Sequence, residues 1–210
     1  MVSSKFLGVL AVVVVVASLF SVGLFYLSAR SLFGAISGYV TSTGEANLTV
    51  ESSAQINFTT AAINWGSGRV NSGASFAYLT TLGTNNVSGG NWTLATAGGL
   101  RILNLGNVNV SLNLSGTKTA AQMIGGTSPA FTWNVSDLEA GSCLNSTGGT
   151  LNMPNLGAWG NVNTSAATFC GRFLFADSTD TIRIDFNLTI PSDSITGAIG
   201  DTITATALAV

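Results

Sequence analysis

The chain has 210 residues, of which seven are lysine or arginine, nine are aspartate or glutamate and none is histidine, so only 8% of it is charged. A soluble domain is ordinarily about 25% charged. The net charge of −2 excludes the basic surface that nucleic acid requires, and the lack of histidine removes the commonest general base and metal ligand. Instead the chain has 24 Ser, 25 Thr, 18 Asn and 25 Gly residues beside 46% hydrophobic residues. This composition predicts one part in lipid and another with an uncharged polar surface.

The first expected element is an apolar helix over residues 6–29, a run of 24 residues without a charge between Lys5 and Arg30. Such a helix is about 36 Å long, enough for a hydrocarbon core of about 30 Å, whereas the apolar core of a signal peptide usually has about 7–15 residues. We therefore expect an uncleaved membrane anchor, with a cleaved signal as the alternative. Lys5 favours a cytoplasmic N-terminus and an extracellular remainder. The valines at 12–16 suit lipid or a bundle of identical helices equally well.

The apolar character ends at Gly38, which predicts two parts: a hydrophobic transmembrane helix over 1–38 and an extracellular β domain over 39–210. The second part has short apolar–polar alternations separated by Gly, Asn and Ser, which is typical of an antiparallel β-sandwich. Its length allows one core or two small ones. Helical character is expected only at 137–140. The expected strands are 46–51, 55–59, 75–81, 91–95, 100–104, 107–115, 130–135, 168–175, 181–190 and 202–208.

Two of these segments alternate most regularly. In 107–115 the even-numbered residues are Val or Leu and the odd-numbered residues are Asn or Ser. In 182–190 the even-numbered residues are apolar, opposite Arg183, Asp185, Asn187 and Thr189. Because strand side chains alternate between the two faces, each segment predicts a strand with its apolar row in the core and its polar row toward solvent.

Asn-x-Ser/Thr glycosylation motifs are unusually frequent. The overall Ser and Thr content would give about four such sites by chance, and the chain has ten. The middle residue is apolar in eight of them, so in a strand the Asn and the hydroxyl residue would share the outer face. We therefore expect several to carry covalent glycans; the alternative is that an Asn- and Thr-rich β surface forms such triplets without sugar. The sites are Asn47, Asn57, Asn86, Asn91, Asn109, Asn113, Asn134, Asn145, Asn163 and Asn187.

The chain has two cysteines, Cys143 and Cys170. Two cysteines in an exported domain predict one disulfide. A metal site would need further ligands, and no histidine or second cysteine pair is available. A nucleophilic cysteine would need a nearby base. The disulfide is therefore the expected role of this pair.

Other candidate sites are weak. Ser115 and Lys118 match a Ser-x-x-Lys pattern, but that chemistry needs a helix N-terminus and Ser115 ends an alternating segment. Asp177, Asp180 and Asp185 could offer oxygens to Ca²⁺ but lack the spacing of a known calcium loop. No nucleophile–base pair or metal set is assembled, so we expect neither an enzyme nor a cofactor. Four tryptophans could stack on sugars or fill the core: Trp65, Trp92, Trp133 and Trp159.

The organisation of the chain resembles that of archaeal cell-surface and pilin-like proteins. A hydrophobic helix is followed by a Gly-containing joint, SGYVTSTG (37–44), and a Thr/Asn-rich β domain. RILNLGNVNVSLNLSG (101–116) is similar to strand pairs of archaeal Ig-like surface modules, and DFNLTIPSDSITGAIGDTITATA (185–207) to the closing segment of secreted archaeal β-sandwiches. The resemblance implies an all-β, Ig-like sandwich after one long helix. One feature departs from archaeal pilins, since Lys5 is followed by Phe6 where a Gly or Ala usually precedes the hydrophobic stretch.

These observations lead to two expected functions. The first is a structural cell-surface glycoprotein, a pilin-like filament or envelope-coat subunit that forms homo-oligomers through its N-terminal helix. The second is a membrane-anchored carbohydrate-binding or adhesin module that acts as a monomer, which exposed aromatic residues on one loop edge would favour. The expected partners are the membrane, covalent glycans and other copies of the chain, without nucleic acid. An exposed edge strand such as 202–208 could also pair with a neighbour.

Overall fold

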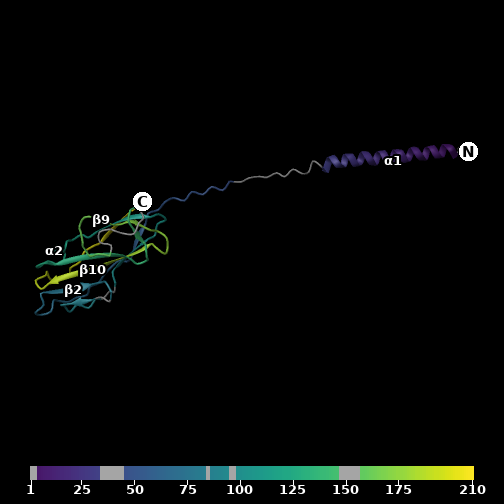
Figure 1. The fold of residues 1–210 in the computed structure, drawn as a ribbon. Coiled ribbons are helices and arrows are strands. Elements are labelled where there is room, and N and C mark those ends of the chain that lie inside the picture. Colours follow the sequence, from purple (N-terminus) through teal and green to yellow (C-terminus); the bar gives the residue numbers. More distant parts are fainter. Residues whose placement is uncertain (1–3, 34–44, 84–85, 95–97, 147–156) are drawn as a thin grey trace. The chain divides into compact units, whose positions relative to one another are not determined.

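The computed structural model describes residues 4–33, 45–83, 86–94, 98–146 and 157–210. Contacts divide the chain into two compact units, Met1–Thr49 and Val50–Val210, which are taken separately below. The domain boundary expected after residue 38 falls outside the described residues. Figure 1 labels the main elements of each unit.

The first unit contains one long helix, α1 (Ser4–Phe33), which includes the whole predicted apolar run 6–29. Its stretch Gly8–Leu27 is long and apolar enough to cross a membrane, a test that a signal sequence near an N-terminus also passes. No residue of this stretch is buried in the structure. The Ser18 hydroxyl lies 2.9 Å from the Val14 carbonyl oxygen and 2.8 Å from that of Val15, so this polar group is satisfied within the helix itself, as a lipid environment requires.

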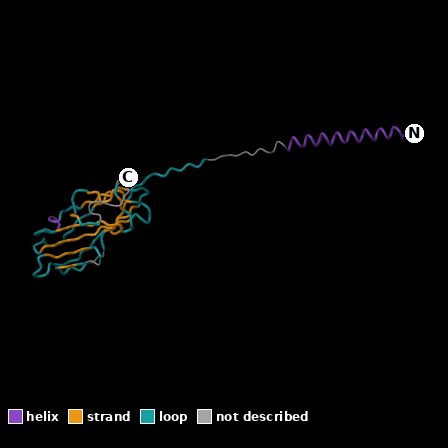
Figure 2. The backbone as a smooth tube through the Cα atoms, viewed as in Figure 1, coloured by secondary structure: helices purple, strands orange, loops and turns teal. Residues whose placement is uncertain are grey.

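The second unit is built from strands, with one short helix among its described residues (Figure 2). All strand pairings between these residues are antiparallel. The elements are β1 (Ile56–Thr60), β2 (Phe76–Thr80), β3 (Val87–Ser88), β4 (Leu100–Asn104), β5 (Val110–Ser115), α2 (Ala120–Met123), β6 (Ala130–Asp137), β7 (Cys143–Leu144), β8 (Gly160–Asn161), β9 (Ala167–Phe173), β10 (Thr181–Pro191) and β11 (Thr204–Ala209).

The larger sheet has seven strands around β10, its longest strand. One edge of β10 pairs with β6, from Ile182 to Thr189. The other edge is shared end to end: β4 pairs with 181–184 and β2 pairs with 187–191. β1 continues the sheet beyond β4, β3 beyond β2 and β8 beyond β6. The strand 181–190 expected from the sequence is therefore the centre of this sheet.

The smaller sheet has the order β11-β5-β9-β7. β11 pairs with β5 from Thr204 to Ala209 and forms one end of this sheet, as expected for an edge strand. Ala205 and Ala207 of β11 pack against the core, while Thr204, Thr206 and Leu208 are exposed.

One hydrophobic core receives side chains from both sheets. Val110, Leu112 and Leu114 of β5 are fully buried, as are the even-numbered residues 182 and 184 of β10, while Phe186, Leu188 and Ile190 are nearly so. Trp133 of β6 and Phe169 of β9 join the sheets edge to face, with ring centroids 4.7 Å apart. The predicted all-β architecture with antiparallel sheets and a preceding apolar helix is confirmed, and it is compatible with an Ig-like sandwich.

Some local predictions were wrong. Residues 46–51 and 91–94 alternate like strands but form none, because alternation reports fitness for a sheet and not the presence of a partner strand. Residues 138–140 form a bend and turn after β6 instead of a helix. The helix α2 was missed although its capping box is readable in sequence: Gln122 N donates to Thr119 Oγ1 at 3.3 Å, and Thr119 N donates to Gln122 Oε1 at 2.9 Å. The two-residue strands β3, β7 and β8 are too short to show a period.

Candidate functional site

The ten glycosylation motifs lie at different depths. The acceptors of five are exposed: Asn47, Asn57, Asn86, Asn91 and Asn163. Those of four are half-buried: Asn109, Asn113, Asn145 and Asn187. Asn134 is 8% exposed, so its position on the outer face of the strand does not leave this acceptor in solvent. Of the eight apolar middle residues, Val110, Leu114, Val135 and Leu188 are buried in the core as the alternation predicted, and Phe58, Val87 and Trp92 are half-buried. The prediction is wrong for Leu48, which is 87% exposed.

Asn134 lies beside a second buried polar residue on the same face of the sheet. It pairs in register with Asp185 of β10, which is fully buried although the alternation placed it toward solvent. A Cβ on Gly99 would overlap the Ile184 carbonyl oxygen and lie 2.9 Å from Asp185 Oδ1, so the backbone just before β4 lies in close contact with β10 at this position. Asp185 is therefore enclosed by neighbouring strands as well as by Asn134.

Asp185 occupies the junction where β4 and β2 meet along β10. Arg183 Nε donates to Asp185 Oδ2 at 2.7 Å, and the Thr81 hydroxyl donates to Asp185 Oδ1 at 3.0 Å. Thr81 Oγ1 in turn accepts a hydrogen bond from the backbone N–H of Phe186 at 2.9 Å. This network satisfies a charge in the sheet interior, so Asp185 has a structural role and is not available as a calcium ligand.

The two half-buried acceptors at β5 differ in their partners. With its amide oxygen turned toward Arg172, Asn109 accepts from Arg172 Nη2 at 3.0 Å and from Nε at 2.9 Å. This arrangement leaves the amide nitrogen of Asn109, the atom to which a glycan is joined, outside the pair. Asn113 Oδ1 is buried and has no hydrogen-bond partner among the described residues.

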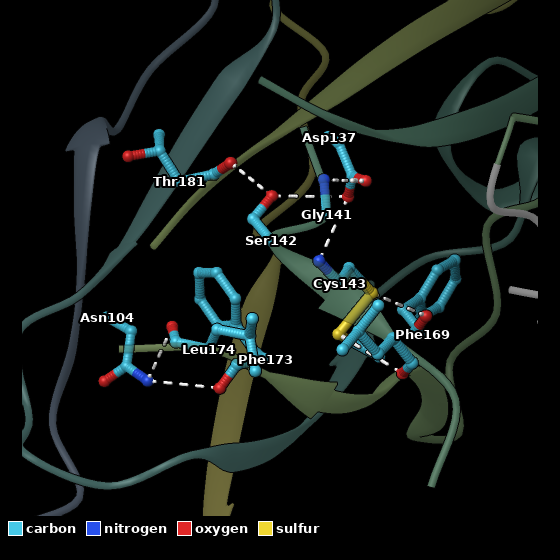
Figure 3. Close-up of a disulfide and its surroundings, with 11 residues drawn as sticks. Asn104, Asp137, Gly141, Ser142, Cys143, Phe169, Phe173, Leu174 and Thr181 are labelled. Atoms are coloured by element: carbon cyan, nitrogen blue, oxygen red, sulfur yellow. Dashed lines mark hydrogen bonds between the residues drawn. A yellow bond between two sulfur atoms is a disulfide. The ribbon is translucent and has the colours of Figure 1, made fainter. Parts of the chain in front are cut away.

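The predicted disulfide between Cys143 and Cys170 is confirmed (Figure 3). Their Cα atoms are 5.4 Å apart, within the usual range for a disulfide. Cys143 lies in β7 and Cys170 in β9, which are neighbours in the smaller sheet. The bond thus holds a two-residue edge strand onto its own sheet, whereas the disulfide of antibody domains joins the two sheets.

The turn before β7 is organised by the Asp137 carboxylate (Figure 3). Its Oδ2 accepts from Gly141 N at 3.1 Å and its Oδ1 from Cys143 N at 3.1 Å. The Ser142 hydroxyl lies 3.2 Å from Asp137 Oδ1 and 2.8 Å from the Thr181 carbonyl oxygen, which ties the turn to β10. These contacts use both carboxylate oxygens for backbone structure, which is a sufficient role for this acidic residue.

The remaining candidate sites are not assembled. Glu139 Oε2 accepts from the backbone N–H groups of Asp180 and Thr181, and burial raises the pKa of Asp180. No group of three carboxylates placed to hold a metal ion occurs in the described parts of the chain. Ser115 lies in a strand, and Lys118 Nζ donates to the Gly200 carbonyl oxygen at 2.6 Å, so the Ser-x-x-Lys pair lacks its helix.

The four tryptophans have separate roles. Trp133 is fully buried, and Trp65 packs against the core from a loop. A Cβ on Gly68 would lie 2.5 Å from the Trp92 ring and one on Gly90 2.6 Å from it, so glycine backbone closes around this ring. Trp92 is therefore a packing residue. Trp65 and Trp92 line a cavity of about 680 Å³, whose lining also includes the core residues Leu79, Leu188 and Ile190.

Trp159 differs from the others because it is exposed on the outer face of the larger sheet. It lines a groove of about 310 Å³ together with Tyr78 of β2, which the sequence analysis did not single out. An aromatic residue at an outward position of an alternating strand was the available signal.

Comparison of this chain with protein families, curated proteins and solved structures finds no match.

Proposed function

We propose that this chain is a structural cell-surface glycoprotein, a subunit of a pilin-like filament or of an envelope coat. The observation that carries the proposal is the sparsely charged surface of the β unit, on which most of the glycosylation motifs are at least partly exposed. With so few charges, such a surface gains from another source of hydration. Covalent sugar at these motifs would supply it.

In this proposal α1 anchors the chain and holds copies together. The stretch Gly8–Leu27 is apolar on all sides and none of it is buried. The apolar side chains suit lipid at the cell membrane, and identical helices in a filament would cover the same surface. The β unit then faces the outside of the cell, where its disulfide is stable.

The edge of the smaller sheet offers a second route to assembly. β11 has six residues with neither a charge nor a proline, while the end strands β3, β7 and β8 have two residues each and β1 contains a register shift. Long, unprotected edges of this kind readily accept another strand. Truncation after Pro191 would remove this edge, but it would also uncover β5. The cleaner variant is Thr206→Lys, which places a charge on the exposed face of β11 and should weaken assembly through this edge.

The test compares cells with and without the gene by negative-stain electron microscopy. We expect the filaments or the surface coat to disappear in the deletion and to return with the wild-type gene. Intact mass spectrometry of native surface material should show a glycan-sized mass excess and one disulfide. Unchanged surface structures in the deletion would contradict the structural role, and unmodified Asn109, Asn113 and Asn187 would contradict the role of sugar.

A second candidate function is a monomeric, membrane-anchored carbohydrate-binding or adhesin module. The observation that favours it is the exposure of Tyr78 and Trp159 at one groove of the outer face. A glycan array and a cell-adhesion assay separate this function from the first. Binding and adhesion by a chain that forms neither filament nor coat would support the second function over the first.

A further inference from the structure

The groove beside Trp159, called here the outer groove, lies on the outward face of the larger sheet. Its volume is about 310 Å³, at the lower end of the range for small-molecule sites. The polar and aromatic residues that line it are Tyr78, Thr80, Asn86, Ser88, Trp159 and Asn187. They come from β2, from β3 and the residue before it, from β10 and from the residue before β8.

The sheet register aligns polar side chains across this face. Asn187 of β10 pairs with Thr80 of β2 on one side and with Thr132 of β6 on the other, and Thr132 pairs with Asn161 of β8. Leu79 and Leu188, the chain neighbours of Thr80 and Asn187, are buried in the core, which directs this row outward. The Asn187 side chain makes no hydrogen bond to another residue in the described ranges. Its amide is thus available for a ligand.

Two aromatic residues flank this polar row. Tyr78 is 48% exposed and Trp159 is 39% exposed, although large aromatic side chains are ordinarily buried where the fold allows it. Two strands lie between β2 and β8, and neighbouring strands are about 4.8 Å apart. The two rings therefore border a gap and do not pack on each other.

The chemistry of the lining selects the ligand class. None of the described residues that line the outer groove carries a charge, so a phosphate, an acidic sugar or a basic peptide would have no counter-charge there. Amide and hydroxyl groups match the donors and acceptors of sugar hydroxyls, and aromatic rings match the apolar faces of sugar rings. We propose that the outer groove binds a neutral saccharide.

This chemistry has two sources. Asn187 is itself the acceptor of a glycosylation motif, so the sugar could be the chain's own glycan lying in the groove, or it could belong to another molecule. The proposal deepens the carbohydrate-binding function above and rests on the outside location of the β unit. It does not depend on filament assembly.

The experiment uses the full chain in detergent and an array of neutral and acidic oligosaccharides. Trp159→Ala and Tyr78→Ala each remove one ring, and Phe175→Ala is the matched control because Phe175 is 42% exposed and lies outside the groove. Thr189→Ala abolishes the glycosylation motif while it leaves the Asn187 side chain in place. Thermal unfolding midpoints show whether each variant folds like the wild type.

Two results support the proposal and distinguish the sources. If the ligand is another molecule's sugar, the wild type binds neutral oligosaccharides, and loss of either ring weakens binding about three- to tenfold while Phe175→Ala does not. If the groove holds the chain's own glycan, the wild type does not bind but Thr189→Ala does, with the same dependence on Trp159 and Tyr78.

The proposal is overturned if neither the wild type nor Thr189→Ala binds a neutral saccharide. Binding that is unchanged by both ring deletions, or binding confined to acidic saccharides, overturns it as well. Electron microscopy of cells that carry Trp159→Ala tests whether saccharide binding and filament or coat formation are independent. Lost saccharide binding by Trp159→Ala with intact filaments would leave the filament proposal standing. Saccharide binding by the wild-type chain, together with unchanged surface structures in the gene deletion, would leave the groove standing and the structural role contradicted.

Discussion

The helix α1 and the β unit distribute polarity in opposite ways. In α1 the backbone polar groups and the Ser18 hydroxyl are satisfied inside the helix, and the apolar side chains of Gly8–Leu27 point outward. In the β unit most apolar strand side chains meet in one core and most polar ones lie on the outer faces of the sheets. The low charge of the whole chain therefore has two causes: a segment that suits lipid, and a surface in which Asn, Ser and Thr replace charged residues.

The largest expected effect on this distribution of polarity comes from a charge placed in the core of the β unit. We expect Phe186→Asp to prevent folding, because Phe186 is buried between the sheets and an unpaired carboxylate there costs several kcal/mol, comparable to the whole stability of a domain. Limited proteolysis and circular dichroism measure the outcome. The control Asn187→Asp places the same charge one residue away on the outer face and should fold. A protease-resistant Phe186→Asp chain would contradict the assigned core.

Removal of the disulfide should have the next largest effect. Cys143 and Cys170 are 27 residues apart, and a closed loop of this size contributes about 3–4 kcal/mol in the chain-entropy model. The double variant Cys143→Ala/Cys170→Ala should lower the unfolding midpoint of the β unit by about 10 °C. Calorimetry with and without reductant measures the unfolding midpoint. Reductant should lower the midpoint of the wild type and leave that of the variant unchanged. Equal midpoints for the oxidised and reduced wild type would refute this.

A charge in α1 should weaken membrane insertion without changing the stability of the β unit. Val14→Arg places a charge near the middle of the apolar stretch, which costs about 2.5–3.5 kcal/mol for membrane insertion. We expect the variant to be extracted from membranes by alkaline carbonate while its β unit keeps the wild-type unfolding midpoint. Val14→Leu is the matched control and should remain in the membrane fraction. A Val14→Arg chain that resists extraction would show that α1 does not anchor the protein.

The smallest expected effect concerns one of the few buried charges of the β unit. Burial raises the pKa of Asp180, and the nearby carboxylates of Glu139 and Asp177 raise it further. The folded chain therefore binds this proton more tightly than the unfolded chain, so this group lowers stability as pH rises above the ordinary carboxyl range of about 4 and through the raised pKa. Asp180→Asn should raise the unfolding midpoint near pH 7 by no more than about 2–4 °C.

The same variant should show no gain at a pH below the ordinary carboxyl range, where Asp180 is protonated in both states. Unfolding midpoints at pH 3 and pH 7 measure the difference. The control Asp177→Asn changes an exposed carboxyl of the same cluster and should have a smaller effect. An equal gain at both pH values would show that the effect of Asp180→Asn is not electrostatic.

Much of the fold could be predicted because the period of a strand is local. The rows at 110–114 and 182–190 are buried as the alternation required, since a one-residue slip would turn every apolar side chain to solvent. The same reasoning failed at Asp185 and at residues 46–51. Asp185 is closely approached by backbone at Gly99, more than 80 residues away in the chain, and residues 46–51 pair with no strand in the described parts of the chain. Neither property depends on the local sequence.

The candidate site divides in the same way. Asn187 was identified from its motif, whereas Tyr78 had no motif and became visible because the sheet places it in the same groove as Asn187 and Trp159. Trp92, which looked equally suited to sugar, is enclosed by Gly68 and Gly90. The exposure of an aromatic ring depends on which residues pack over it, and the sequence alone does not predict that packing.

The sequence by itself determined the apolar helix, the β class, the inward rows of the strands and the pairing of the two cysteines. Each of these follows from a local period, an uninterrupted apolar length or the number of available partners. Tertiary structure decided which strands are neighbours, how β4 and β2 share the edge of β10, which polar residues are buried and where the outer groove lies. These features arise from pairing between segments far apart in the chain. The energy of such a contact depends on both segments and cannot be deduced from either one alone.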